Sequence, residues 1–117
     1  FIGDGVITLR VREYLVSEGF TRSKDLQEKS IIYVSAKGQA AFMESLLANE
    51  ALTETEFTIY KRGRNANLGA TAKNVSIVVY RVASGFEALI GYLYYADQTR
   101  MTEILDEMIE FHADSIR

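Results

Sequence analysis

The chain contains, from residue 77 to residue 96, the segment IVVYRVASGFEALIGYLYYA, which is almost wholly apolar. The segment is about as long as a membrane span, but it carries Arg81 and Glu87. Each charge near the centre of a bilayer costs roughly 2.5 to 3.5 kcal/mol, and one serine and two glycines lower the hydrophobicity further. We therefore expect a helix from about Asn74 to Ala96, buried inside a soluble protein and not in a membrane.

Further helices are predicted on both sides of this segment, because apolar residues recur at three- and four-residue spacing. The first runs from about Ile2 to Ser17 and ends at Gly19, a second opens near Ser23, and a third runs from about Ser30 to Asn49. Residues 31–34, which are Ile-Ile-Tyr-Val, could instead form a short strand, although no partner strand is evident nearby. The chain is therefore expected to be all-α.

The second half of the chain has clear helix boundaries. Thr53 followed by Glu56 is a capping box, which predicts a helix from there to about Arg62. A loop is expected next, because the following stretch holds residues that tolerate left-handed backbone: Gly63, Asn65, Asn67 and Gly69. After residues 97–99, a final amphipathic helix is expected.

Length and composition indicate one domain over residues 1–117. The chain is 48% hydrophobic, enough for one core, and it has no cysteine and no proline. Without cysteine there is neither a disulfide framework nor a thiolate metal cluster, and no secretion signal is evident, so we expect a cytoplasmic protein. Because the chain begins with Phe1 and not with methionine, we expect N-terminal residues to be missing.

The charge is distributed unevenly. The net charge is −3, which by itself argues against nucleic acid, but residues 57–86 contain no Asp or Glu. Five basic residues fall within these thirty: Lys61, Arg62, Arg64, Lys73 and Arg81. Such a segment is typical either of phosphate contact or of a solvated basic face, and charge alone does not separate the two.

Two carboxylates lie on helical faces that are otherwise apolar. Asp4 shares a face with Ile7 and Val11, and Glu87 lies in the long apolar helix. A carboxylate removed from water must be paired, hydrogen-bonded or bound to a cation. An ion pair such as Arg81 with Asp4 and a metal site are equally compatible with this spacing. A metal held by oxygen ligands without nearby histidine or cysteine would be Mg²⁺ or Mn²⁺.

Four motifs that occur in register over nearly the whole chain resemble the sequences of one known family. Residues 1–6 (FIGDGV) resemble the ribonuclease III signature helix, and residues 85–91 (GFEALIG) resemble its second catalytic helix. Residues 34–40 (VSAKGQA) and residues 62–67 (RGRNAN), leading to Lys73-Asn74, resemble the Mini-ribonuclease III branch. The resemblance implies the all-α ribonuclease III endonuclease-domain fold in a homodimer.

The resemblance also implies an activity. Members hydrolyse phosphodiester bonds of double-stranded RNA with bound Mg²⁺, for which Mn²⁺ can substitute, and leave 5′-phosphate and 3′-hydroxyl ends. Asp4 and Glu87 match the metal-binding, catalytic carboxylates. Ser84 stands where larger relatives carry an aspartate, and a fourth acid would precede Phe1, which puts the number of ions and the metal affinity in doubt. The usual task in bacteria is maturation of the 23S-type ribosomal RNA precursor, with a ribosomal protein as a possible helper.

RNA contact and dimerisation are also expected from the resemblance. No double-stranded RNA-binding domain is present in these residues, so the basic segment is expected to bind RNA through Lys61, Arg62, Arg64, Asn67 and Lys73. Phe1 matches a position that inserts an aromatic ring into the partner subunit. His112 is expected to be a surface residue without a chemical role. The alternative functions are a non-catalytic double-stranded RNA-binding protein of the same fold and a helical dimerisation module without RNA.

Overall fold

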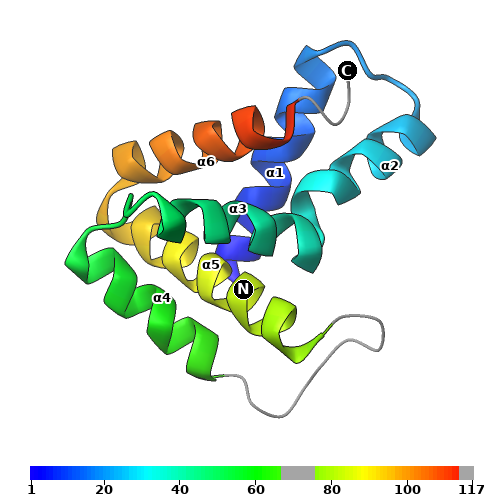
Figure 1. Ribbon diagram of the computed structural model, residues 1–117. Helices are drawn as coiled ribbons and strands as arrows, with labels where there is room; N and C mark the ends of the chain where they lie inside the picture. Colours follow the sequence, from blue (N-terminus) through cyan, green and yellow to red (C-terminus); the bar gives the residue numbers. More distant parts are fainter. Residues whose placement is uncertain (67–75, 114–117) are drawn as a thin grey trace.

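The computed structural model describes residues 1–66 and 76–113, and in this part of the chain it shows six α-helices and no strand (Figure 1). The helices are α1 (Ile2–Ser17), α2 (Ser23–Val34), α3 (Ala36–Ala48), α4 (Glu54–Ala66), α5 (Ile77–Ala96) and α6 (Gln98–Ala113). The all-α prediction is confirmed, and α1 has the bounds that the apolar spacing predicts.

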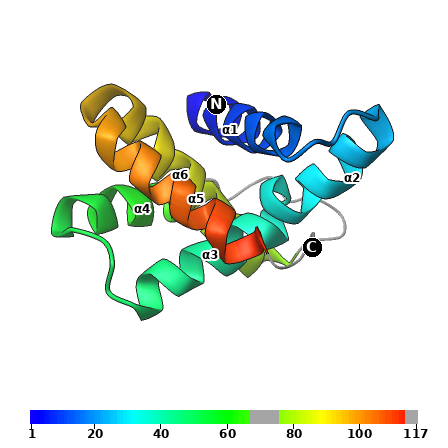
Figure 2. The same cartoon turned by 90° about the horizontal axis from the view of Figure 1, so that it is seen from above.

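Helix α5 is the centre of the fold, as its apolar sequence predicts. It packs against α1, α3, α4 and α6, and the views in Figures 1 and 2 show these helices arranged around it. Five of its apolar side chains belong to the core: Val82, Phe86, Leu89, Ile90 and Leu93. By length and composition alone α5 could cross a membrane, but a core helix passes the same test, and the packing on four neighbours explains its composition.

Glycines allow the neighbouring helices to approach α5 closely. A methyl group added to Gly63 of α4 would overlap the side chain of Ala88 and lie 3.2 Å from the carbonyl oxygen of Ser84. The predicted loop is therefore wrong at Gly63 and Asn65, which lie inside α4. The glycine at position 63 serves helix packing and not a turn, and periodicity does not distinguish these two uses. Asn67 and Gly69 lie outside the described residues.

The boundary between α2 and α3 differs from the prediction. Residues 31–34 are helical and complete α2, so the strand alternative is wrong. The break falls at Ser35, whose side-chain oxygen accepts a hydrogen bond from the backbone nitrogen of Gly38 at 3.0 Å. A side chain at Gly38 would overlap the carbonyl oxygen of Ile32, so glycine allows the sharp change of direction here. The sequence predicted both helices but placed their boundary about five residues too early.

The capping box at the start of α4 is confirmed and extended by a contact with α6. The backbone nitrogen of Thr53 donates to Glu56 Oε1 at 2.9 Å, and the backbone nitrogen of Glu56 donates to Thr53 Oγ1 at 3.1 Å. Arg100 of α6 donates to both carboxylate oxygens of Glu56, at 2.8 and 3.0 Å, and to the carbonyl oxygen of Ala51 at 2.8 Å. This nearly buried ion pair joins the starts of α4 and α6.

Candidate active site

The two predicted catalytic carboxylates come together where α1 crosses α5. At the crossing, Gly3 lies directly against the backbone of α5, and an added methyl group would overlap the carbonyl oxygen of Glu87. Asp4 follows Gly3 by one residue, so its side chain begins beside Glu87. Residues 83 positions apart in the sequence are thus neighbours because a glycine permits close contact between two backbones.

The burial of the site and the closeness of Asp4 change the pKa of Glu87. Partial burial of its carboxyl group raises its pKa above the ordinary value, and the charge of Asp4 raises it further, whereas a hydrogen bond from Gln39 acts in the opposite direction. Two carboxylates that repel each other in a partly buried position destabilise the protein, and either a proton held by Glu87 or a bound cation relieves this repulsion. The pair is thus a candidate cation site.

The ion-pair alternative is not supported within the described residues. No ion pair there includes Asp4 or Glu87. Arg81, the proposed partner of Asp4, has its Nε atom buried without a hydrogen-bond partner. Over residues 1–66 and 76–113, no cluster of three or more His, Cys, Asp or Glu side chains adds a further ligand. The structure therefore places two acids together and provides neither a basic partner nor a third acid among the residues that it describes.

The burial of the two carboxylates is unequal, which corrects one expectation. Ile7 and Val11 are fully buried, as the apolar stripe on α1 predicts, but Asp4 and Phe1 at the start of the same stripe are exposed in the single chain. Only Glu87 is partly removed from water. An exposed acid next to a partly buried one is accessible to a ligand that arrives from solvent.

Gln39 is a contact of Glu87 that the sequence analysis did not single out. Its side chain is 1% exposed, and its Nε2 atom donates to Glu87 Oε2 at 3.4 Å and to the carbonyl oxygen of Val34 at 3.1 Å. The sequence contained a signal for this contact. Gln39 lies four and seven residues before Met43 and Leu46, so it shares their apolar helical face, and the structure shows that both are buried. A polar residue on such a face requires a hydrogen-bonding partner.

The expectation that His112 is a surface residue is wrong. It is buried, and its Nε2 atom lies 2.9 Å from the carbonyl oxygen of Gly38. Its ring also meets the ring of Tyr33 edge to face, with centroids 5.4 Å apart. The acidic neighbours in sequence were misleading, because His112 shares its helical face with Leu105 and Met108, which are core residues.

Three of the five predicted RNA-binding residues lie at the end of α4. Arg62 is exposed, and Lys61 and Arg64 are half-exposed. Aromatic rings support two of the three cations: Lys61 Nζ lies 4.7 Å from the centroid of Phe57, and the Arg64 guanidinium lies 5.5 Å from that of Tyr60. Asn67 and Lys73 lie outside the described residues. The end of α4 is therefore a basic, solvent-accessible surface.

An apolar hollow of about 400 Å³ lies beside Asp4. Its lining comes from the exposed side of α1 and from the end of α5: Phe1, Ile2, Asp4, Gly5, Val6, Leu9 and Tyr94. Leu9 is 60% exposed, and Tyr95 next to the hollow's Tyr94 is 76% exposed. None of the three tyrosines at the end of α5, Tyr92, Tyr94 and Tyr95, is a core residue in the single chain, and all three are exposed.

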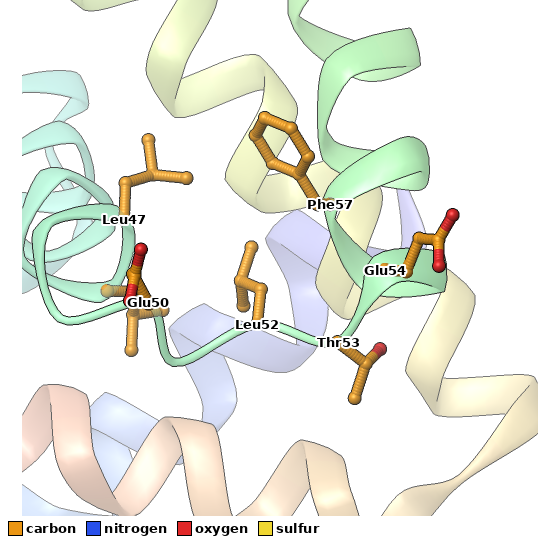
Figure 3. A pocket seen from close by; sticks show the side chains of 7 residues that line it. Leu47, Glu50, Leu52, Thr53, Glu54 and Phe57 are labelled. Carbon is orange, nitrogen blue, oxygen red and sulfur yellow. The ribbon is translucent and has the colours of Figure 1, made fainter.

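A second hollow, of about 320 Å³, lies between the end of α3 and the start of α4 (Figure 3). Figure 3 shows Leu47, Leu52 and Phe57 around it, with Glu50, Thr53 and Glu54 at its rim. Neither predicted carboxylate lines this hollow, and it contains no basic side chain. It is therefore separate from the candidate active site.

Comparison with known proteins identifies the family of the chain. The family model of the ribonuclease III domain matches residues 1–98. The chain is 46% identical to Mini-ribonuclease 3 of Enterococcus faecalis over 95% of this chain and 82% of that protein. It is 42% identical to Mini-ribonuclease 3 of Streptococcus pneumoniae over 90% and 82% of the two chains.

A crystal structure shows the same fold. Protein FN1578 from Fusobacterium nucleatum superposes with a TM-score of 0.85 at 24% identity, over 96% of this chain and 88% of that one. At this identity the likeness concerns the fold alone. Family match, relatives and fold together show that the chain belongs to the Mini-ribonuclease 3 group of the ribonuclease III domain family and is an endoribonuclease.

Proposed function

We propose that this endoribonuclease cleaves double-stranded RNA with the help of Mg²⁺ held by Asp4 and Glu87. The observation that carries the proposal is the juxtaposition of these two carboxylates across the α1–α5 crossing, without a basic partner among the described residues. Glycosidase-type acid–base chemistry between two carboxylates does not suit an RNA-cleaving family, whereas phosphodiester hydrolysis commonly uses carboxylate-bound metal ions.

The donor set fits Mg²⁺. This ion is commonly bound by one or two carboxylates together with water and substrate phosphate, and Mn²⁺ accepts the same oxygen ligands. Asp4 is exposed, so a phosphate from solvent can reach the site, and Glu87 is partly buried, so its position is restricted. When bound, Mg²⁺ supplies Lewis-acid stabilisation of the phosphate and activation of water for attack.

The protein's own part in the reaction is to hold and orient. Gly3 brings Asp4 next to Glu87, and α5, packed on four helices, provides a rigid base for Glu87. Attack of water on phosphorus would break the bond to the 3′ oxygen, which takes up a proton, so that hydrolysis leaves a 5′-phosphate and a 3′-hydroxyl end. Ser84, one turn before Glu87, adds no charge, so we expect a modest affinity for the metal.

The basic end of α4 supports RNA as the ligand. Lys61, Arg62 and Arg64 are accessible, and Asn67 and Lys73, which lie outside the described residues, are proposed to bind RNA together with them. Double-stranded RNA is recognised mainly through its shape, phosphates and 2′-hydroxyls, so sequence preference is expected to be modest. As the natural substrate we propose a bacterial precursor of 23S-type ribosomal RNA, cut in the cytoplasm with a ribosomal protein as a helper.

A homodimer is proposed on the apolar hollow around Phe1 and Leu9. The hollow combines exposed apolar side chains from α1 and α5 and lies beside Asp4. A two-fold pairing of this surface would bury these side chains and place two active sites on one two-fold symmetric duplex.

The test is cleavage of a long RNA duplex by the purified protein with Mg²⁺, beside Asp4→Asn, Glu87→Gln and an EDTA control. We expect cleavage by the wild type alone, with 5′-phosphate and 3′-hydroxyl ends. If both variants, folded by circular dichroism, cut at the wild-type rate, the assignment of Asp4 and Glu87 is wrong. If cleavage is unchanged in EDTA, the metal requirement is wrong.

A further inference from the structure

The side-chain amide of Gln39 lies against the candidate metal site from a third helix. It reaches across from α3, and its Nε2 atom bridges Glu87 Oε2 at 3.4 Å and the carbonyl oxygen of Val34 at 3.1 Å. The carbonyl oxygen of Val34 can only accept a hydrogen bond, so the amide must point its NH₂ group toward it and toward Glu87. The orientation of Gln39 is therefore fixed by the chemistry of its neighbours.

This orientation lowers the stability of the fold, and an apolar side chain at position 39 would not have this effect. Gln39 is 1% exposed, and its Oε1 atom is buried without a hydrogen-bond partner. An unsatisfied buried carbonyl costs about 1 to 3 kcal/mol, and an apolar side chain of similar volume beside Met43 and Leu46 would remove that cost. The position therefore keeps an amide although packing alone does not require one.

Contacts at the boundary between α2 and α3 hold Gln39 in place. Ser35 caps α3 through the backbone nitrogen of Gly38, and His112 of α6 contacts the carbonyl oxygen of the same glycine at 2.9 Å. Both contacts fix the residue immediately before Gln39. A donor fixed in this way restricts the rotation of the Glu87 carboxylate, and partners of metal-binding carboxylates commonly have this role.

We propose that Gln39 is a positioning residue of the active site, which orients the carboxylate of Glu87 for metal binding. The inference rests on the proposed function, because it takes Glu87 as a metal ligand. In this proposal Gln39 acts through its hydrogen bond to Glu87 and not by direct contact with the metal or the RNA. The expected consequence of losing its NH₂ group is a metal affinity about 10- to 100-fold lower, the range typical of partners of metal ligands.

The first experiment measures binding of Mn²⁺ to the full chain by calorimetry, without RNA. Gln39→Met and Gln39→Leu keep the approximate volume and remove the donor, and we expect weaker Mn²⁺ binding with melting temperatures in EDTA equal to or above that of the wild type. The matched control is Thr53→Ala, which removes a side-chain cap of the same kind from α4, where no contact holds Gln39. Its melting temperature should fall while its Mn²⁺ affinity stays at the wild-type value.

The outcomes separate the inference from the proposed function. If the wild type binds Mn²⁺, Glu87→Gln does not, and the Gln39 variants bind as the wild type does, the metal site stands and the positioning role is wrong. If Thr53→Ala loses affinity as much as Gln39→Met, the effect reflects general destabilisation and the positioning role is again wrong. If the wild type binds no Mn²⁺, the proposed metal site is wrong, and this inference with it.

A second measurement needs no substitution. The chain has three glutamines, Gln27, Gln39 and Gln98, and their side-chain NH₂ groups give separate signals in a nitrogen–proton correlation spectrum of the labelled wild type. On addition of Mg²⁺, we expect the Gln39 signal to shift and those of Gln27 and Gln98 to stay. An unchanged Gln39 signal at saturating Mg²⁺ would overturn the proposal.

Discussion

Gly3 lies so close to Glu87 that a single methyl group at position 3 would overlap the carbonyl oxygen of Glu87. This contact joins the first helix to the central one and places Asp4 beside Glu87, the second candidate carboxylate. A glycine that contributes no side chain thus decides the geometry of the site. The same crossing includes Gly91, where an added methyl group would lie 3.4 Å from the backbone nitrogen of Gly3, an ordinary contact distance.

Gly3→Ala is expected to separate α1 from α5, lower the free energy of unfolding by about 2 kcal/mol and reduce RNA cleavage, because the overlap is with backbone that cannot move away alone. Gly91→Ala at the same crossing is the matched control. It should keep the activity and raise stability by up to about 1 kcal/mol through its better helix propensity. Urea unfolding and duplex cleavage measure both effects, and equal behaviour of the two variants would contradict the close-packing role of Gly3.

Glu87→Gln is expected to stabilise the metal-free protein while it abolishes cleavage. The pKa of Glu87 is raised by burial and by Asp4, so its contribution to stability is present at acid pH and is lost as the pH rises through the raised pKa. At pH 7 to 8 the variant should therefore melt higher than the wild type in EDTA, and the difference should disappear toward pH 4.

The control for this prediction is Glu13→Gln, a change of the same charge at an exposed position of α1. It should leave the melting temperature nearly unchanged. Added Mg²⁺ should raise the melting temperature of the wild type and of Glu13→Gln but not that of Glu87→Gln. A Glu87→Gln protein that is less stable than the wild type in EDTA at pH 8 would show that the carboxylate is favourably paired.

Arg100→Met is expected to destabilise the fold by about 3 kcal/mol at neutral pH, because it leaves Glu56 nearly buried without its partner. This is the low end of the range for buried pairs, since the Arg100 side chain is 22% exposed. Burial by itself would raise the pKa of Glu56, but hydrogen bonds from Arg100 and Thr53 and the charge of Arg100 lower it below the ordinary value.

Because the pKa of Glu56 is lowered, the stability difference between the wild type and Arg100→Met should depend on pH. The stabilisation is present above the ordinary pKa of a glutamate and is lost as the pH falls through the lowered pKa, so the difference between wild type and variant should shrink below about pH 4.5. Lys24→Met, in the exposed pair with Glu28, is the control and should cost less than about 1 kcal/mol. Chemical unfolding at a series of pH values makes the comparison.

Arg62→Ala, in an Asp4→Asn background that prevents cleavage, is expected to weaken binding of duplex RNA at low salt. The slope of log affinity against log salt concentration should fall by about one unit, as for the loss of one phosphate contact. Lys24→Ala on α2 removes the same charge far along the chain from the basic end of α4 and should leave the slope unchanged. Equal slopes for all three proteins would exclude Arg62 from the RNA-binding surface.

Leu9→Glu is expected to convert the proposed dimer into a monomer, as measured by sedimentation or light scattering. Leu9 is 60% exposed and lines the hollow with Phe1, so a charge there opposes burial against a second subunit. Val16→Glu is a close control, because Val16 is 59% exposed on the same helix but does not line that hollow. If Val16→Glu dissociates the dimer and Leu9→Glu does not, the interface lies elsewhere on α1.

The predictions from sequence were strongest where a pattern is local. The period of apolar residues predicted six helices and the bounds of α1, and the capping box predicted the start of α4. The predictions failed where one residue type has two uses. Gly63 and Asn65 belong to a helix although they were expected in a loop, and His112 is buried although its sequence neighbours are acidic.

The sequence by itself determined that the chain is all-α, that α5 is its centre, and that Asp4 and Glu87 are the acids to examine, because periodicity and motif similarity are properties of the linear chain. Only the tertiary structure decided that Gly3 brings these acids together, that Gln39 reaches Glu87 from α3, and that Arg100 closes the capping box of Glu56. These relationships depend on how closely helices approach one another. That distance is set by side-chain volume at the crossings, where residues far apart in the sequence meet.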